Sequence, residues 1–443
     1  MSSLDFLFDP ERIALIGAAH TEEKLGGVVL KNLLRFRGKV YPVNPKYREL
    51  MGVPAFAAIN DIPERVDTAI IMRPAEEVPG ILKELKDRAT SAIIVSSGFS
   101  ETGREDLQNE VQHIGREAGI RLLGPNCMGV YNIRRRLDTF FISYEKLKRP
   151  KQGNIALLSQ SGAVMTCLFE SIRDSNTGVA KAVGIGNAVD IDIPDIYEYF
   201  AHDPDTAIVI SYIESLGDGR RFIEAAKRLS ERKSLIVLKS GKGSIGQAAA
   251  YSHTGRLAGK YEVFNSIMRQ FGIKEVNNFD ELIDAAKALS YQKPSRGNRV
   301  CIITNGGGSG VLAADECMRQ GLEVARVSDE KLKKLKELFP PFYGMNNPVD
   351  LTAQVKDEDY ATTLETLKGD YDGFLIIALT GVAGITEQLA GIVESFKIKT
   401  GKPIVAYTAN SMSHRLNARL ERAGIPVYPS PERAIRGLKA LLG

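Results

Sequence analysis

The stretch GNIALLSQSGAVM, residues 153–165, indicates how this chain folds. An apolar run is followed by a hydroxyl residue, a turn of small residues and the start of a helical pattern. This order is typical of a strand that leads into a helix in a parallel sheet. Residues 298–312, NRVCIITNGGGSGVL, have the same order. The two matching openings predict two related flavodoxin-like domains.

The N-terminal part of the chain contains a similar alternation of short apolar runs and helical patterns. Strands are expected at 13–17, 40–44, 69–72, 93–97 and 122–124, each next to Gly, Pro or Ser. Such an alternation is the pattern of parallel sheets covered by helices. We therefore expect an α/β protein in which a Rossmann-like domain precedes the two flavodoxin-like domains.

The length and the linker-like stretches predict three domains, because a domain averages roughly 150 residues and the chain has 443. We place their limits at 1–130, 131–290 and 295–443. The basic stretch 134–153 is interpreted as a connector. YQKPSRGNR, residues 291–299, is rich in Pro, Ser and Gly and is interpreted as a linker.

The composition is that of an ordinary globular protein, with 44% hydrophobic and 25% charged residues. A net charge of +4 is too small to indicate nucleic acid. No stretch approaches the roughly 18 apolar residues that cross a bilayer, and the start MSSLDFLFDP has no secretory pattern. The four cysteines form no CxxC pair, which argues against a zinc ribbon or a disulfide framework. We expect a cytoplasmic protein with no metal site, no membrane partner and no nucleic-acid partner.

The two small-residue turns are candidate phosphate sites, because backbone N–H groups and the helix dipole converge at a helix N-terminus. Small residues in such turns can instead merely allow close packing of helix and strand. Two similar turns in sister domains favour anion binding. The candidates are Ser159, Gln160, Ser161 and Gly162 in the first turn, and Asn305, Gly306, Gly307, Gly308 and Ser309 in the second.

The turn after the first predicted strand does not have the dinucleotide-binding spacing GxGxxG. Only Gly17 stands at the strand end, and the paired Gly26 and Gly27 follow a longer polar loop. The second strand ends without an acidic residue that could hold a ribose 2′-hydroxyl. Lys46 at that strand end instead suits a cofactor with an additional phosphate, as in NADP or CoA, so NAD is disfavoured.

His253 is the histidine whose surroundings suggest chemistry. It lies in GKGSIGQAAAYSHTGRLAGK, residues 241–260, after the predicted strand SLIVLKS. Glu214 ends the preceding strand, and parallel topology brings neighbouring strand ends to one edge of a sheet. A carboxylate there could orient the imidazole and leave its other nitrogen as a nucleophile. The alternative is an exposed loop histidine and a solvated strand-end acid.

Several motifs together resemble the α subunit of ADP-forming acetyl-CoA synthetase, a family related to succinyl-CoA synthetase. In chain order they are IGAAHTEEKLGG, YPVNPK, SSGFSETG, GPNCMGVYN, LLSQSGAV, SHTGRLAG, TNGGGSGVLAAD and NPVDLT. The resemblance covers essentially the whole chain. It implies succinyl-CoA synthetase-like flavodoxin domains behind a CoA-binding Rossmann-like domain.

The resemblance implies a three-step reaction. Phosphate attacks the acyl-CoA thioester, the acyl phosphate then phosphorylates His253, and the phosphohistidine passes its phosphoryl group to ADP. Glu214 would steady the phosphohistidine, and the two turns would hold the phosphate at two helix N-termini.

The CoA and acyl site is implied by the same resemblance. Its residues would be Gly17, Ala18, Lys24, Asn44, Lys46, Ser97, Gly98, Asn126 and Cys127. Residues 124–127 would line the thioester, and Cys127 would be a packing residue beside it.

The resemblance also implies a partner, because nothing in the chain is typical of an ATP-grasp domain. A separate ATP-grasp β subunit would bind ADP or ATP with Mg²⁺, in an α2β2 heterotetramer. The alternatives are a succinyl-CoA or citryl-CoA ligase subunit, a non-catalytic CoA-binding protein and an NADP-dependent oxidoreductase. The order of domains argues against the first, His253 and Glu214 against the second, and the missing GxGxxG against the third.

Overall fold

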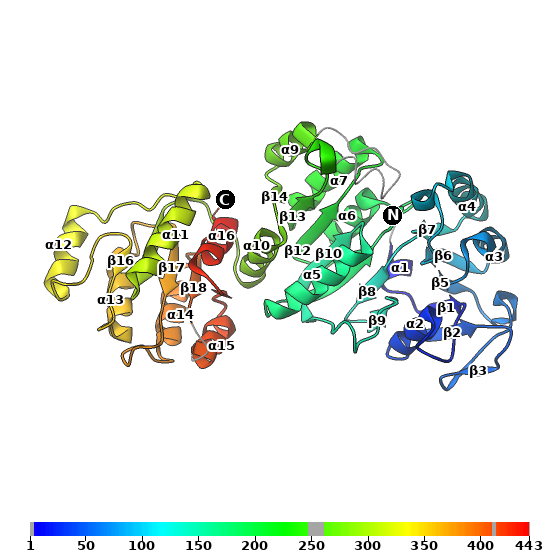
Figure 1. Ribbon diagram of the computed structural model, residues 1–443, viewed down its shortest axis with the longest axis horizontal. Coiled ribbons are helices and arrows are strands. Elements are labelled where there is room, and N and C mark those ends of the chain that lie inside the picture. Colours follow the sequence, from blue (N-terminus) through cyan, green and yellow to red (C-terminus); the bar gives the residue numbers. More distant parts are fainter. Residues whose placement is uncertain (1–3, 247–260, 410–412, 443) are drawn as a thin grey trace. The chain divides into compact units, whose positions relative to one another are not determined.

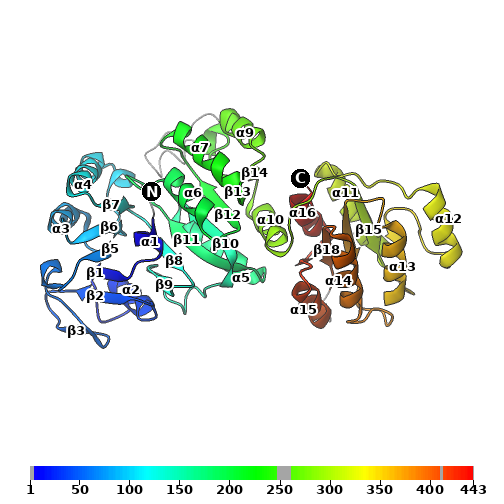
Figure 2. The ribbon, with the colours of Figure 1, turned by 180° about the vertical axis from the view of Figure 1, so that it is seen from behind.

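The computed structural model describes residues 4–246, 261–409 and 413–442. The chain divides into two compact units, Met1–Asn277 and Asn278–Gly443. Both are drawn in Figure 1 and, from behind, in Figure 2. Within the described residues, no helix has the length and apolar character needed to span a bilayer.

The first sheet is fully parallel and has the strand order β2-β1-β5-β6-β7. Its strands are β1 (Arg12–Ile16), β2 (Lys39–Val43), β5 (Val66–Ile71), β6 (Ala89–Ile94) and β7 (Arg121–Leu123). They occupy the five places predicted from sequence. The helices are α1 (Asp5–Phe8), α2 (Leu25–Leu33), α3 (Val78–Glu84) and α4 (Glu105–Ala118). Smaller elements are the hairpin β3 (Glu49–Leu50) and β4 (Val53–Pro54), and the 3₁₀ turns η1 (Ile59–Asp61), η2 (Ala75–Glu77) and η3 (Ser100–Thr102).

The second sheet has the order β14-β13-β12-β10-β11-β8-β9. Its parallel strands are β10 (Lys151–Ser159), β11 (Gly178–Gly184), β12 (Ile208–Ile213), β13 (Ser234–Lys239) and β14 (Lys274–Val276). Two antiparallel strands, β8 (Gly129–Asn132) and β9 (Leu137–Asp138), extend one edge. The helices are α5 (Gly162–Asp174), α6 (Ile193–His202), α7 (Gly219–Ser230) and α9 (Tyr261–Gln270). Helix α5 packs on β10 and β11, whereas α7 packs on β13 and on α6.

The stretch 134–153 is more than the connector predicted from sequence, because β9 and the start of β10 lie within it. Arg149 Nε lies 2.8 Å from Asp138 Oδ2, and both side chains are almost completely buried. Burial raises the pKa of Asp138, and the Arg149 charge opposes that shift. A basic composition therefore concealed a buried ion pair that attaches this stretch to the second sheet.

The two sheets of the first unit share one hydrophobic core, which includes Leu15 and Ile70 of the first sheet and Leu158 and Val183 of the second. The amide of Asn32 on α2 donates to the Phe140 carbonyl at 2.8 Å. These contacts join the first sheet and its helix α2 to the second sheet.

The third sheet, in the second unit, is parallel and has the order β16-β15-β17-β18-β19. Its strands are β15 (Val300–Thr304), β16 (Val349–Asp350), β17 (Gly373–Ile377), β18 (Ile404–Tyr407) and β19 (Val427–Tyr428). The helices are α10 (Phe279–Tyr291), α11 (Gly307–Arg319), α12 (Asp329–Leu338), α13 (Asp357–Leu367), α14 (Leu389–Thr400), α15 (His414–Arg422) and α16 (Pro431–Leu441). Strands β16 and β17 were not predicted from sequence.

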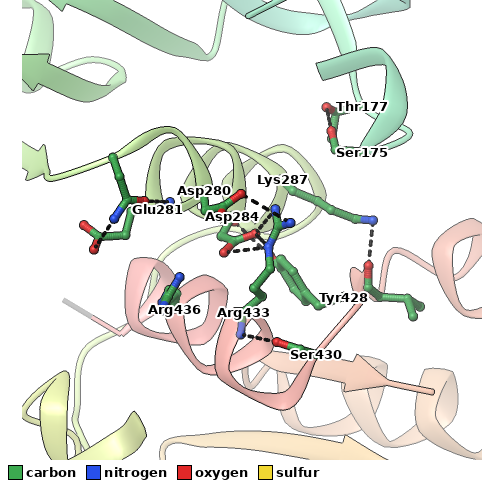
Figure 3. Close-up of polar contacts among 12 residues, drawn as sticks. Ser175, Thr177, Asp280, Glu281, Asp284, Lys287, Tyr428, Ser430, Arg433 and Arg436 are labelled. Atoms are coloured by element: carbon green, nitrogen blue, oxygen red, sulfur yellow. Dashed lines mark hydrogen bonds and ion pairs between the residues drawn. The ribbon is translucent and has the colours of Figure 1, made fainter. Parts of the chain in front are cut away.

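Helix α10 packs against α16 within the second unit. Figure 3 shows Arg433 of α16 reaching Asp284 of α10, with Nη2 to Oδ1 at 2.7 Å. The Tyr428 hydroxyl donates to the Asp284 carbonyl at 2.9 Å, and Lys287 Nζ donates to the Val427 carbonyl at 2.7 Å. The three domain limits stay a prediction, because the compact units number two and the first contains two sheets.

All three sheets have the same arrangement of their parallel strands, with the first strand between the second and the third. In such sheets the connections leave in opposite directions at the first strand, and ligands bind beyond its carboxyl end. The first strands are β1, β10 and β15. The candidate turns at Gly17, Ser159 and Thr304 therefore lie at the positions where this topology binds ligands.

Candidate active site

The loops at the carboxyl edge of the first sheet hold the first group of predicted residues. Gly17 follows β1 with a φ of 91°, and a Cβ atom there would lie 2.5 Å from the Met72 carbonyl oxygen. Only glycine fits this conformation and this space. The Asn44 amide donates to the carbonyl of buried Ala18 at 2.8 Å, which ties the ends of β1 and β2 together.

Two lysines stand on exposed parts of these loops. Lys24 is the N-cap residue of α2, and Lys46 donates its backbone N–H to Asn44 Oδ1 at 2.9 Å. Gly98, after β6, has a φ of 105° and donates its N–H to Glu101 Oε1 at 2.6 Å.

Asn126 and Cys127 lie in the turn after β7. Asn126 has a φ of 56° and donates its N–H to the Ser96 carbonyl at 2.9 Å. Cys127 is buried, and its thiol donates to the Ile94 carbonyl at 3.2 Å. Burial raises the pKa of Cys127 to about 12, so the thiol stays protonated at neutral pH and is not a nucleophile.

The turn after β10 is held by its own side chains. Ser159 Oγ accepts from the Ser161 N–H at 3.1 Å and donates to the Ser161 carbonyl at 2.7 Å. Gln160 Oε1 accepts from the N–H groups of Glu214 and Ser215 at 2.5 and 3.0 Å, and Nε2 donates to the Ser215 carbonyl at 3.0 Å. The Gln160 side chain thus fixes the end of β12 against the turn.

Glu214 is buried directly after β12. Lys239, at the end of neighbouring β13, donates from Nζ to the Glu214 carbonyl at 2.8 Å. Burial lowers the pKa of Lys239 to about 8, against the attraction of the Glu214 and Glu275 charges. Sequence reasoning missed this buried lysine, although its place at a strand end beside Glu214 is visible in the sequence. His253 lies outside the described residues.

The turn after β15 repeats this hydrogen-bond pattern in the second unit. Thr304 Oγ1 accepts from the Gly306 N–H at 2.9 Å, and the Asn305 side chain exchanges hydrogen bonds with both backbone groups of Leu379. Gly306 is the N-cap of α11 and offers no side-chain cap. Gly307 and Gly308 are exposed, and Ser309 is half-buried.

A cavity of about 630 Å³ in the first unit joins several of the predicted residues. Ser97, Asn126 and Cys127 from the first group line it together with Gln160, Ser161 and Gly162 of the turn after β10. Gly17, Ala18, Lys24, Asn44, Lys46, Gly98 and Glu214 are not among its lining residues.

Nine lining residues of this cavity were not among the predicted site residues, and they include Arg73, Met128 and Phe141. Arg73 directly follows the residue after β5, so a cation at a strand end could have been noticed. Its guanidinium makes two 2.9 Å hydrogen bonds to the Glu77 carboxylate.

A larger cavity of about 860 Å³, lined mainly by α6 and α7, contains none of the predicted residues. Within residues 4–246, 261–409 and 413–442, no group of three or more His, Cys, Asp or Glu side chains could hold a metal ion.

Three family models match the chain in succession. A CoA binding domain matches residues 11–133, a succinyl-CoA ligase-like flavodoxin domain matches 152–289, and a Ligase-CoA domain matches 300–431. Together with the first and third sheets, which are parallel, and the second, which is mainly parallel, they confirm the predicted fold class.

Relatives of known name match over almost the full chain. The α subunit of ADP-forming acetate–CoA ligase II from Pyrococcus furiosus is 38% identical over 450 residues, which cover 99% of this chain and 97% of the relative. ADP-forming acetate–CoA ligase from Methanocaldococcus jannaschii is 36% identical over 99% of this chain, which spans only 63% of that longer protein.

A solved structure matches equally far. Acetyl-coenzyme A synthetase 1 from Ca. Korarchaeum cryptofilum, solved with phosphate and ADP, superposes with a TM-score of 0.90 at 33% identity. The alignment covers 100% of this chain and 96% of that chain.

Proposed function

This chain belongs to the family of ADP-forming acetate–CoA ligases, and we propose that it acts as the α subunit. Members of this family are acid–thiol ligases. In the direction of ATP synthesis, acetyl-CoA, phosphate and ADP give acetate, CoA and ATP. The chain would carry out the thioester and phosphohistidine steps.

The cavity that joins the two groups of residues is the observation that carries the proposal. Ser97 and Asn126 come from the edge where a CoA thioester would enter, and Ser161 and Gly162 begin the helix where phosphate would sit. Phosphate on this turn would lie beside the acyl carbon. Holding both reactants in one cavity would make the step effectively unimolecular and so remove much of its entropic cost.

The proposed chemistry has three steps. A phosphate oxygen attacks the acetyl carbonyl carbon, the C–S bond breaks, and CoA leaves as a thiolate that takes up a proton. A ring nitrogen of His253 then attacks phosphorus, the bond to the acetate oxygen breaks, and acetate leaves. Finally an ADP β-phosphate oxygen attacks phosphorus, the N–P bond to His253 breaks, and the imidazole is regenerated.

Residues of this chain would stabilise the charges of the imidazole and of the CoA phosphates during these steps. Glu214 would accept a hydrogen bond from the imidazole and stabilise its cationic form. Gln160 keeps the end of β12, and therefore Glu214, at a fixed position beside the turn. Lys24 and Lys46 are placed on exposed loops where they could neutralise CoA phosphates.

The remaining components belong to the proposal as well. Two relatives that match along nearly their whole length are named α subunits, which supports a partner subunit for this chain. We infer an ATP-grasp β subunit that binds ADP with Mg²⁺, in an α2β2 assembly. The cytoplasmic location stays a prediction.

The test is phosphate-dependent release of CoA from acetyl-CoA by the chain together with an ATP-grasp partner and ADP. Each CoA released should be matched by one ATP, and omission of phosphate or the change His253→Asn should abolish both. ATP formation that is undiminished by His253→Asn would rule out the phosphohistidine route. Propionyl-CoA, succinyl-CoA and phenylacetyl-CoA, assayed in parallel, would define the range of acids.

A further inference from the structure

Glu275 in β14 is a nearly buried carboxylate that receives three hydrogen bonds. One donor precedes residues 247–260 in the sequence, and the other two follow them. The Glu275 side chain is 8% exposed. Lys242 Nζ lies 2.7 Å from Oε1, the Tyr261 hydroxyl donates to Oε1 at 2.8 Å, and the Asn265 amide donates to Oε2 at 2.8 Å. Both carboxylate oxygens are therefore engaged by these partners.

The partners stand on either side of the part of the sequence that carries His253. Lys242 comes shortly after β13, whereas Tyr261 and Asn265 lie on the first turns of α9. Lys242 Nζ is also 5.2 Å from the centre of the Tyr261 ring, and it donates to Asn277 Oδ1 at 3.1 Å. The chain therefore leaves and returns at one point on the edge of the second sheet.

The negative charge of Glu275 is balanced by the Lys242 ammonium. Burial by itself raises the pKa of Glu275, but the hydrogen bonds from Lys242, Asn265 and Tyr261 outweigh it and lower that pKa. The carboxylate is therefore ionised at neutral pH, and its bonds to these donors are charge-assisted. Removing it would leave the Lys242 ammonium half-buried without its anion.

The strand register sets Glu275 close to the proposed catalytic edge. Val237 of β13 pairs with Glu275, and Lys239, two residues on, pairs with Ile213 of β12 next to Glu214. Because β14, β13 and β12 are hydrogen-bonded neighbours, the position of Glu275 relative to the Glu214 backbone is fixed by the sheet.

We propose that Glu275 is a positioning residue, which fixes both ends of the His253-bearing segment to the sheet edge that carries Glu214. The proposal rests on the role of His253 given under Proposed function. It assigns Glu275 no contact with substrate. Glu275 holds Lys242, which precedes the segment, and Tyr261, which follows it, at fixed positions beside β14.

The first test reads local order without using catalysis. The chain contains no tryptophan, so Ile245→Trp, at a position that is 87% exposed, introduces a single indole between Lys242 and Tyr261. Time-resolved fluorescence anisotropy should show a larger amplitude of fast motion when Glu275→Gln is added. Glu262→Gln, the same change at an exposed acid on α9, is the matched control and should leave the amplitude unchanged.

The second test separates turnover from substrate binding in the complete enzyme. Glu275→Gln should lower kcat by about tenfold or more, as expected for small misplacement of a reacting group. The KM values for acetyl-CoA and phosphate should stay within about twofold. Lys242→Met should add little in the Glu275→Gln background, because the two side chains act together.

The two tests fail in distinguishable ways. Unchanged anisotropy and unchanged kcat in Glu275→Gln would overturn the positioning role. Increased motion together with unchanged kcat would also overturn it, because the anchored ends would then not matter for turnover. If Glu275→Gln increases the motion but the wild-type chain never incorporates phosphate, the proposed function is contradicted instead. If Glu275→Gln does not fold, Tyr261→Phe removes one of the three donors and is measured in its place.

Discussion

The turn after β10 and the turn after β15 are built alike, yet their helices begin differently. In each turn a hydroxyl residue, Ser159 or Thr304, binds both backbone groups of the residue two positions on. In each, the next side chain, Gln160 or Asn305, binds the backbone of a neighbouring strand end. The helices α5 and α11 then start from Ser161 and from Gly306.

The difference lies in the helix cap. The Ser161 hydroxyl accepts the Val164 N–H at 3.4 Å, so α5 satisfies part of its own N-terminus. Gly306 gives α11 no such acceptor, and exposed Gly307 and Gly308 follow. Uncapped N–H groups at a helix start need an outside acceptor. Two turns with matching sequence patterns can therefore differ in how strongly they depend on a bound anion.

In each turn one side-chain amide, that of Gln160 or Asn305, braces the turn against a neighbouring strand end. Removing either brace should have the largest effect on stability. Gln160→Ala leaves the N–H groups of Glu214 and Ser215 buried without an acceptor, and each such loss costs about 1–3 kcal/mol. We expect a loss of about 4 kcal/mol in the free energy of unfolding, and about 2 kcal/mol for Asn305→Ala. Chemical denaturation measures both, and equal losses would show that the two braces are equivalent.

A pH titration of stability tests how burial affects Asp284 of α10 in the second unit. Burial raises the pKa of Asp284 from 3.8 to about 6, against the attraction of Arg433. Between these values the folded state holds a proton that the unfolded state has lost, so stability falls as pH rises. Relative to Asp284→Asn, the wild type should lose up to about 3 kcal/mol between pH 4 and pH 7. Thermal melts of both proteins decide this, and a pH-independent difference would contradict it.

The glycines at the first positions of α5 and α11 give a smaller contrast. A Cβ atom on Gly307 would lie 2.7 Å from Asp350 Oδ2, whereas one on Gly162 would lie 3.8 Å from Met128 Sδ. Asp350 is held by the Thr352 N–H at 2.9 Å and cannot move freely. Gly307→Ala should cost about 1–2 kcal/mol, while Gly162→Ala should be within about 0.5 kcal/mol of the wild type. The order of the two melting temperatures is the measurement, and the reverse order would contradict it.

Removing the cap of α5 should have the smallest effect. Ser161→Ala should cost about 1 kcal/mol, and Ser161→Gly, which gives α5 the same start as α11, only a few tenths. Differential scanning calorimetry resolves the pair. A loss from Ser161→Gly as large as that from Ser161→Ala would mean that Ser161 acts through a contact other than the cap.

Much of the fold could be predicted because apolar periodicity is a local signal. The strands β1, β2, β10 and β15 and the turns after them follow from runs of Ile, Val and Leu next to small residues. The stretch that forms β9 could not be predicted, since the Arg149–Asp138 pair depends on residues whose charges look solvent-exposed in sequence. The contacts between α10 and α16 could not be predicted either, because the two helices are distant in sequence.

The candidate site shows the same limit. Parallel topology predicted that strand ends would gather residues, and the cavity brings Asn126 near Ser161. It could not predict Met128 or Phe141 in the cavity lining, because which side chains face a cavity depends on packing between two sheets. The brace made by Gln160 was also missed, since nothing local distinguishes a glutamine that crosses to β12 from one in solvent.

The most direct test of the central claim is incorporation of radiolabelled phosphate into the purified chain in the presence of acetyl-CoA. We predict one acid-labile, base-stable phosphoryl group per wild-type chain and none on His253→Asn. We also predict that each group incorporated is accompanied by release of one CoA. Equal labelling of wild type and His253→Asn, or label that survives acid, would contradict the assignment of His253 and with it the proposed route to ATP.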